Sequence, residues 1–115
     1  MAGLVKVPWY ATGFRGDRLA EALAEVAPVA LRYGAQRYEV QRSTEDRYRF
    51  SQIAVFERHS DWDRYWYGPE MEAFRLRCSG WFQVPIVYEW YETVAEGGIG
   101  AADEIPEGEA PSVRG

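Results

Sequence analysis

The 115-residue sequence has one cysteine, Cys78, and one histidine, His59. A single cysteine cannot close an internal disulfide, and the chain has no Cys-x-x-Cys pair or Cys/His cluster that would indicate structural zinc. Glycine patterns for dinucleotide or phosphate binding are missing as well. We therefore predict no metal and no cofactor, and we expect the protein to reside in the reducing cytoplasm.

Long apolar runs and an excess of basic residues are also missing. No run approaches the roughly 20 apolar residues of a membrane helix, and the N-terminal apolar stretch is too short for a secretion signal. The formal net charge of -5 opposes electrostatic binding to nucleic acid. The sequence therefore predicts a soluble protein whose partners include neither nucleic acid nor a membrane.

Aromatic residues, in contrast, are abundant at 16% of the chain. Three of the five tryptophans fall between Phe56 and Phe82. Because the chain is short enough for one domain, many large rings must be buried in a small body. A core, a dimer interface and a pocket for a flat ligand are three uses for so many rings, and the sequence favours a dimer with a pocket.

Hydrophobic spacing predicts alternating strands and helices. The predicted elements are a strand over 4–14, a helix over 17–33, strands over 35–43 and 47–58, a helix from about 60 to 81 that is interrupted at 68–70, and a strand over 83–94. We expect Asp17 to cap the first helix, Pro28 to bend it and Gly34 to end it, and either Ser60 or Asp61 to cap the second.

This order of elements predicts an α+β, ferredoxin-like βαββαβ fold with a four-stranded antiparallel sheet and both helices on one face. The third strand carries Ile53 and Val55 on the face opposite Phe50 and Ala54, so both faces of the sheet need cover. A second copy of the chain is the natural cover, which predicts a homodimer. We assign residues 1–94 to this domain and residues 95–115 to a flexible, acidic tail rich in Gly and Pro.

Three segments, "GFRGDRLAEAL", "FERHSDWDRYWYGPEMEAF" and "VPIVYEWYETV", together with the element order, resemble the antibiotic biosynthesis monooxygenase-like family. The resemblance covers about residues 4–94 and implies the dimeric α/β barrel of that family. It implies, as function, a cofactor-independent monooxygenase acting on an aromatic or polyketide-like small molecule. The alternatives are a non-enzymatic module that binds a small ligand or a partner, and a protein that binds or degrades haem.

The sequence departs from the family pattern at two positions. The histidine that family members often carry on the second helix falls here on Tyr65, and His59 lies about a turn and a half earlier. The asparagine that oxygenases and haem degraders commonly use near the first strand has no counterpart, since the chain contains no asparagine. Trp9 and Tyr10 occupy that neighbourhood.

The candidate catalytic residues are Tyr65, His59 and Tyr10. A phenol can donate a hydrogen bond to a substrate oxygen. An imidazole, whose unperturbed pKa is about 6.5, can act as a base or bind haem. The alternatives are that the tyrosine hydroxyls are satisfied by backbone partners and that His59 is an exposed residue of the first helical turn.

The candidate substrate-binding residues are aromatic. Trp9, Trp62 and Trp66 are predicted to form the walls of a pocket for a small aromatic ligand, with Tyr38 and Tyr88 as further phenols in it. Core packing is the alternative use of the same rings, because aromatic residues at helical spacing are usually buried in the core.

Overall fold

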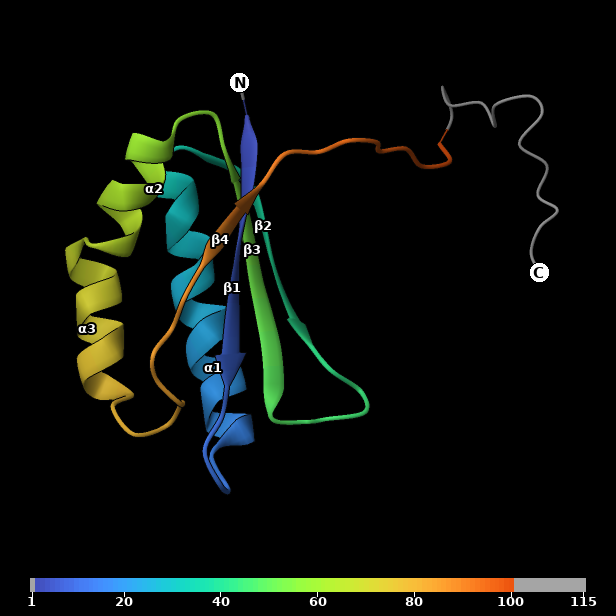
Figure 1. Cartoon of the computed structure of the whole chain (residues 1–115). Coiled ribbons are helices and arrows are strands. Elements are labelled where there is room, and N and C mark those ends of the chain that lie inside the picture. Colours follow the sequence, from blue (N-terminus) through green and yellow to red (C-terminus); the bar gives the residue numbers. More distant parts are fainter. Residues whose placement is uncertain (1, 101–115) are drawn as a thin grey trace, which may run out of the picture.

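The computed structural model describes residues 2–100, in which helices cover one face of a four-stranded sheet (Figure 1). The elements, in chain order, are β1 (Gly3–Tyr10), α1 (Gly16–Val26), the 3₁₀ helix η1 (Ala27–Tyr33), β2 (Ala35–Arg42), β3 (Arg49–Phe56), α2 (His59–Trp66), α3 (Pro69–Arg77) and β4 (Glu89–Tyr91). The part of the predicted tail beyond residue 100 lies outside the described residues.

The sheet has the strand order β2-β3-β1-β4 and every pairing is antiparallel. The predicted α+β, ferredoxin-like fold is confirmed. Within residues 2–100, no helix combines the length and the apolar composition needed to cross a bilayer.

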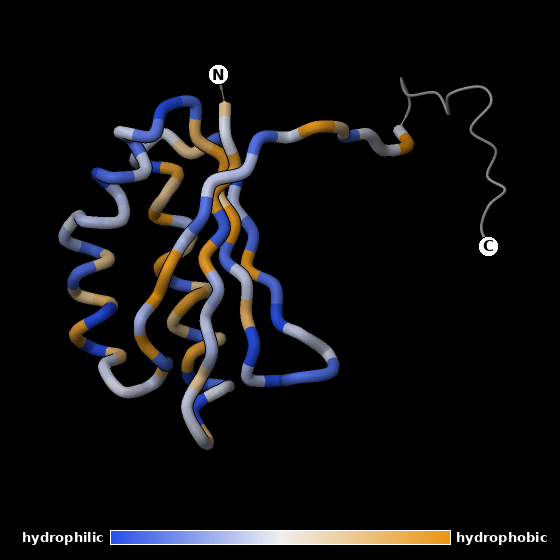
Figure 2. The backbone as a smooth tube through the Cα atoms, viewed as in Figure 1, coloured by the Kyte–Doolittle hydropathy of each residue, from blue (hydrophilic) through white to orange (hydrophobic). Residues whose placement is uncertain are grey.

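Alternation along the strands places the core on the helix side of the sheet. Val5, Val7 and Trp9 of β1 are buried there, and so are the even-numbered residues of β3 from Phe50 to Phe56. Figure 2 shows the resulting pattern, with hydrophobic and hydrophilic residues alternating along the strands. The other face, which we call the bare face, has no helix over it.

The predicted first helix is two elements rather than one. The α-helix ends at Val26, and the chain continues as the 3₁₀ helix η1 because Pro28 lacks the N–H that a further α-helical turn would use. Gly34 ends this segment as predicted, with a φ of 106° in the left-handed region. The predicted capping role of Asp17 is wrong, since Asp17 lies in the first turn and pairs with Arg42 at 2.9 Å.

The predicted interruption of the second helix is confirmed. α2 ends at Trp66 and α3 begins at Pro69. The predicted caps are wrong, because α2 already begins at His59 and its N-cap residue, Arg58, makes no side-chain capping bond. Gly68 stands between the two helices in extended conformation.

Substituting Gly68 by alanine is expected to destabilise the protein. A Cβ there would collide with the carbonyl oxygen of Arg64 and lie 3.2 Å from the Tyr33 hydroxyl, and the carbonyl cannot yield without moving the end of α2. We expect the free energy of unfolding to fall by about 1–3 kcal/mol. Urea denaturation measures this. Gly13→Ala is the control, because a Cβ at Gly13 has no heavy atom within 4 Å, and equal effects of the two substitutions would refute the account.

The predicted last strand over 83–94 is much shorter than expected, since only Glu89–Tyr91 pairs with β1. Gln83 donates its backbone N–H to the Tyr10 carbonyl at 2.8 Å, so even-numbered residues of β1 direct their backbone groups toward this edge. Pro8 has no N–H to offer there, and the ladder stops at Lys6. The residues between, Gln83–Tyr88, have no regular structure, and we call them the strap.

Candidate functional site

A cluster of rings fills the space between α2, α3 and the sheet. Trp62 and Trp66 are stacked, with ring centres 5.1 Å apart and 21° between the planes, and Trp9 lies 5.9 Å from Trp66. The aromatic cluster consists of Trp9, Trp62, Tyr65, Trp66, Phe74, Phe82 and Tyr88. The structure therefore brings together most of the aromatic residues that the sequence singled out.

Local geometry explains why these side chains meet. Residues 62, 65 and 66 share one face of α2, because positions three and four apart are neighbours on a helix. Trp9 follows Val5 and Val7 on the helix side of β1, where alternate residues point the same way. Trp62 and Trp66 stack directly on one another, so these two walls of the predicted pocket leave no room for a ligand ring between them in this arrangement.

Tyr65 uses its hydroxyl inside the protein. The hydroxyl donates to the Val26 carbonyl at 2.8 Å and accepts from Nε2 of Gln52 at 3.1 Å, while Oε1 of Gln52 accepts from Nε1 of Trp9 at 3.0 Å. Burial raises the pKa of Tyr65 well above its usual range. This phenol therefore holds β1, β3, α1 and α2 together and is not free to exchange a proton with a ligand.

Two buried nitrogens of the cluster have no hydrogen-bond partner among residues 2–100, Nε1 of Trp62 and Nη1 of Arg75. The other terminal nitrogen of Arg75 donates to the Trp66 carbonyl at 2.9 Å, and its guanidinium carbon lies 5.1 Å from the centre of the Trp66 ring. A buried donor without an acceptor costs roughly 1–3 kcal/mol, and a charged one costs more. Each of these two groups lies against the Trp66 ring and has a donor without an acceptor in hydrogen-bond geometry among residues 2–100.

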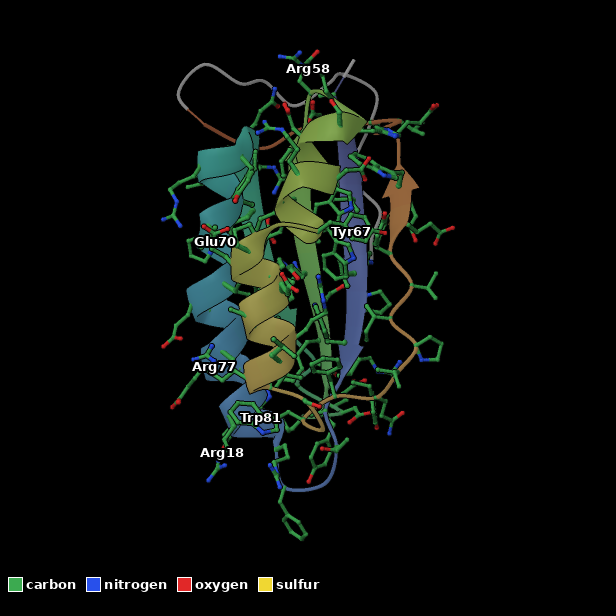
Figure 3. All side chains as sticks on the ribbon, turned by 90° about the vertical axis from the view of Figure 1, so that its left-hand side faces the viewer. Arg18, Arg58, Tyr67, Glu70, Arg77 and Trp81 are labelled. Atoms are coloured by element: carbon green, nitrogen blue, oxygen red, sulfur yellow. The ribbon has the colours of Figure 1, made fainter. Side chains whose placement is uncertain are left out.

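The strap covers the cluster through Tyr88. Its ring stands edge-on to Trp62 at 5.2 Å and to Trp66 at 5.5 Å. Partial burial raises the pKa of Tyr88, while the Trp62 N–H acts in the opposite direction, so that this N–H lies near the phenol oxygen without reaching hydrogen-bond geometry. Tyr67 extends from the end of α2 on the side that faces the strap and β4 (Figure 3).

His59 lies at the outer end of α2. It is exposed, and its ring stacks on Trp90 with 3.7 Å between centres and 8° between planes. The aromatic cluster thus contains no histidine that could serve as the axial ligand of a haem. Within residues 2–100, no group of three or more His, Cys, Asp or Glu side chains is placed to hold a metal ion.

Tyr10 lies on the bare face, because it is adjacent to Trp9 in β1 and successive strand residues point to opposite faces. Its hydroxyl donates to Asp46 at 2.7 Å, which lowers the pKa of Asp46 and raises that of Tyr10. Tyr10 borders a pocket of about 650 Å³, the sheet-face pocket, between the bare face and the strap. The predicted catalytic residues Tyr65, His59 and Tyr10 therefore occupy three separate places.

Tyr38 also lies apart from the cluster. It is half-buried on β2, two strands away from β1, and makes no ring contact with the cluster within the described part of the chain. Arg75 and Gln52, in contrast, are site residues that the sequence analysis missed. The sequence offers a signal for one of them, since Gln52 is a polar residue at a core-facing position of β3.

Comparisons with known proteins add to this picture. No family model matches the sequence, and no curated protein matches it. Solved structures do match. A candidate antibiotic biosynthesis monooxygenase from Nitrosomonas europaea shares 16% identity with a TM-score of 0.74, over 84% of this chain and 94% of that one.

Two further solved structures are similar. SnoaB from Streptomyces nogalater, described as a cofactor-independent oxygenase, shares 14% identity with a TM-score of 0.70, over 83% of this chain and 95% of that one. NE2512 from Nitrosomonas europaea, described as of unknown function, shares 17% identity with a TM-score of 0.71, over 86% of this chain and 95% of that one. The chain has the fold of the proteins named antibiotic biosynthesis monooxygenases.

Proposed function

We propose that the protein binds a planar aromatic small molecule in the aromatic cluster and oxygenates it without a cofactor. The observation that carries the proposal is the pair of buried donors, Nε1 of Trp62 and Nη1 of Arg75, beside the same indole ring of Trp66. A phenol or enol oxygen of an aromatic ligand is an acceptor that suits both a neutral N–H and a guanidinium.

Tyr88 occupies the place that the ligand would take. Its ring already contacts Trp62 and Trp66, and its oxygen lies near the Trp62 N–H. The strap that carries it has no regular structure, and Val84 and Val87 in it are exposed. Outward movement of the strap would exchange the Tyr88 ring for a ligand ring with little change in the rest of the core.

The proposed reaction uses electrons of the substrate. The Arg75 cation stabilises the oxyanion of an ionised phenol, such as the enol tautomer of an anthrone, and the electron-rich anion reduces dioxygen. In the product, the ring CH₂ has become C=O with one oxygen atom of O₂, and the other oxygen atom leaves as water with the two hydrogens. The protein orients the anion against the indoles and keeps bulk water away from it.

The comparison with SnoaB supports this reaction class, because that protein has the same fold and is described as a cofactor-independent oxygenase. At 14% identity the likeness carries the fold and not the substrate. The choice of an aromatic phenol therefore depends on the donors and rings of this chain.

Oxygen consumption with a panel of anthrones and naphthols tests the proposal. We expect oxygen uptake with at least one member, together with a rise in melting temperature when that compound is added without oxygen. His59→Ala should leave both unchanged, because His59 lies outside the cluster. No uptake and no thermal shift across the panel would refute the proposal.

A second candidate is a non-enzymatic module that binds the same kind of ligand. The lack of a proton-transfer group in the cluster favours this candidate. The Tyr65 hydroxyl donates to the Val26 carbonyl, and the cluster has no histidine to serve as a base. The same panel separates the two candidates. Thermal shifts without oxygen uptake would identify the protein as a binding module, and oxygen uptake would identify it as an oxygenase.

We also propose that a second copy of the chain covers the bare face. Leu4, Ile53 and Val55 lie side by side there and remain half-buried, and no helix covers them. These apolar residues would bury more surface if the bare faces of two copies packed against each other around a two-fold axis.

Light scattering is expected to give twice the monomer mass of 13.2 kDa at micromolar concentration. Ile53→Arg should shift the mass to that of a monomer, because a charge would have to be buried between two sheets. Leu76→Arg is the control, since Leu76 is 74% exposed on α3. A monomeric wild-type protein would contradict the proposed dimer.

A further inference from the structure

One ridge of α2 faces the strap and β4. His59, Asp63 and Tyr67 follow one another at steps of four residues and therefore lie along one line of the helix, which we call the α2 ridge. At one end of the ridge the His59 ring stacks on Trp90 of β4 at 3.7 Å. At the other end Tyr67 lies on the side that faces the strap (Figure 3). The chain from Tyr88 to Trp90 therefore runs along this ridge.

The α2 ridge borders the Tyr88 side chain. The Tyr88 ring contacts Trp62 and Trp66, and each of these residues is followed directly by a residue of the ridge. A helix turns by about 100° per residue, so Asp63 and Tyr67 lie beside the two indoles on the same side. Burial raises the pKa of Tyr88, and the Tyr67 hydroxyl and the Asp63 charge raise it further, because both favour a phenol that keeps its proton.

The Tyr88 hydroxyl therefore has polar neighbours of two kinds. Nε1 of Trp62 is a buried donor without a partner among residues 2–100, and the hydroxyl oxygen of Tyr67 is an acceptor. A hydroxyl group suits both neighbours, since it can accept one hydrogen bond and donate another. An ether oxygen suits only the donor, because it has no proton to give.

We infer that Tyr67 accepts a hydrogen bond from the hydroxyl group of the bound ligand, and that the site thereby selects aromatic compounds with a free hydroxyl over the corresponding ethers. The inference rests on the proposed function, since the ligand ring takes the place of the Tyr88 ring. Asp63 favours the same choice, because its negative charge attracts the hydroxyl proton. The Tyr67 side chain is 68% exposed, so its removal should affect the ligand far more than the stability of the fold.

Calorimetric titration without oxygen tests the role of Tyr67. The probes are a hydroxynaphthalene and its methyl ether, at pH 7, where a phenol keeps its proton. We expect the hydroxynaphthalene to bind roughly tenfold more tightly, as one hydrogen bond allows. In Tyr67→Phe this preference should fall about threefold or more, while the affinity for the ether stays unchanged. Any steric effect of the ether methyl group is the same in both proteins and cancels in the comparison.

Tyr91→Phe is the matched control. Tyr91 is also exposed, but its hydroxyl donates to Glu89 at 3.0 Å, and alternation along β4 places it on the face opposite Trp90. This variant should keep the preference for the hydroxynaphthalene. Equal affinities of the two probes in the wild-type protein would overturn the inference, and so would a Tyr67→Phe protein with the wild-type preference. Binding of neither probe would instead refute the proposed function, so the two failures are distinguishable.

Discussion

Replacing Trp9 with alanine is expected to lower the free energy of unfolding by about 3–5 kcal/mol. Trp9 is 1% exposed, and its ring contacts Trp66, Phe74 and Phe82 at 5.9, 5.5 and 4.9 Å. The substitution opens a large cavity and also leaves Oε1 of Gln52 without its donor. Denaturant unfolding followed by circular dichroism measures the loss.

Two further variants separate packing from hydrogen bonding. Trp9→Phe keeps a six-membered ring and removes the N–H with a smaller part of the side-chain volume, so we expect a smaller loss of about 1–3 kcal/mol. Phe14→Ala removes a ring that is 97% exposed and should change stability by less than about 0.5 kcal/mol. A Trp9→Ala protein as stable as Phe14→Ala would show that the cluster is not the core.

The second large effect is expected at Arg75. Arg75→Gln should lower the rate of oxygenation roughly 100- to 1000-fold, because removing a preorganised donor to a developing oxyanion costs about that much in other enzymes. Arg75→Lys keeps the charge and should lose less. Initial rates of oxygen uptake at saturating substrate give the comparison.

Arg77→Gln is the control for Arg75, since Arg77 lies on the same helix but is exposed and pairs with Glu25 at 3.4 Å. Its rate should match that of the wild-type protein. Because Arg75 also bonds the Trp66 carbonyl, the melting temperature of each variant has to be measured. A folded Arg75→Gln protein with the wild-type rate would refute the proposed role of the guanidinium.

The core could be predicted from the sequence because its signals are local. The alternation of Val5, Val7 and Trp9 and the spacing of Trp62 and Trp66 each lie within one element, and both patterns hold in the structure. The extent of β4 could not be predicted in this way. Whether residues 83–88 pair depends on the direction of the Pro8 backbone in a different strand.

The candidate site shows the same limit. Arg75 and Gln52 acquire their roles from partners in other elements, the Trp66 carbonyl at the end of α2 and the indole of Trp9 in β1. Tyr10 and Trp9 are adjacent in the sequence, but alternation along β1 places them on opposite faces of the sheet. Residue type therefore indicated an aromatic site, and only the three-dimensional arrangement showed which polar groups border it.

The central claim is that a ligand oxygen accepts a hydrogen bond from Trp62. Nitrogen-15 labelling of the five tryptophans gives one indole N–H signal for each in a proton–nitrogen correlation spectrum, and Trp62→Phe identifies the signal of Trp62. On titration with an anaerobic hydroxynaphthalene we expect this signal to move to higher proton frequency, as it does when an N–H gains an acceptor. The Trp9 signal should move little, because Trp9 already donates to Gln52. A saturated complex in which the Trp62 signal keeps its free position would contradict the claim.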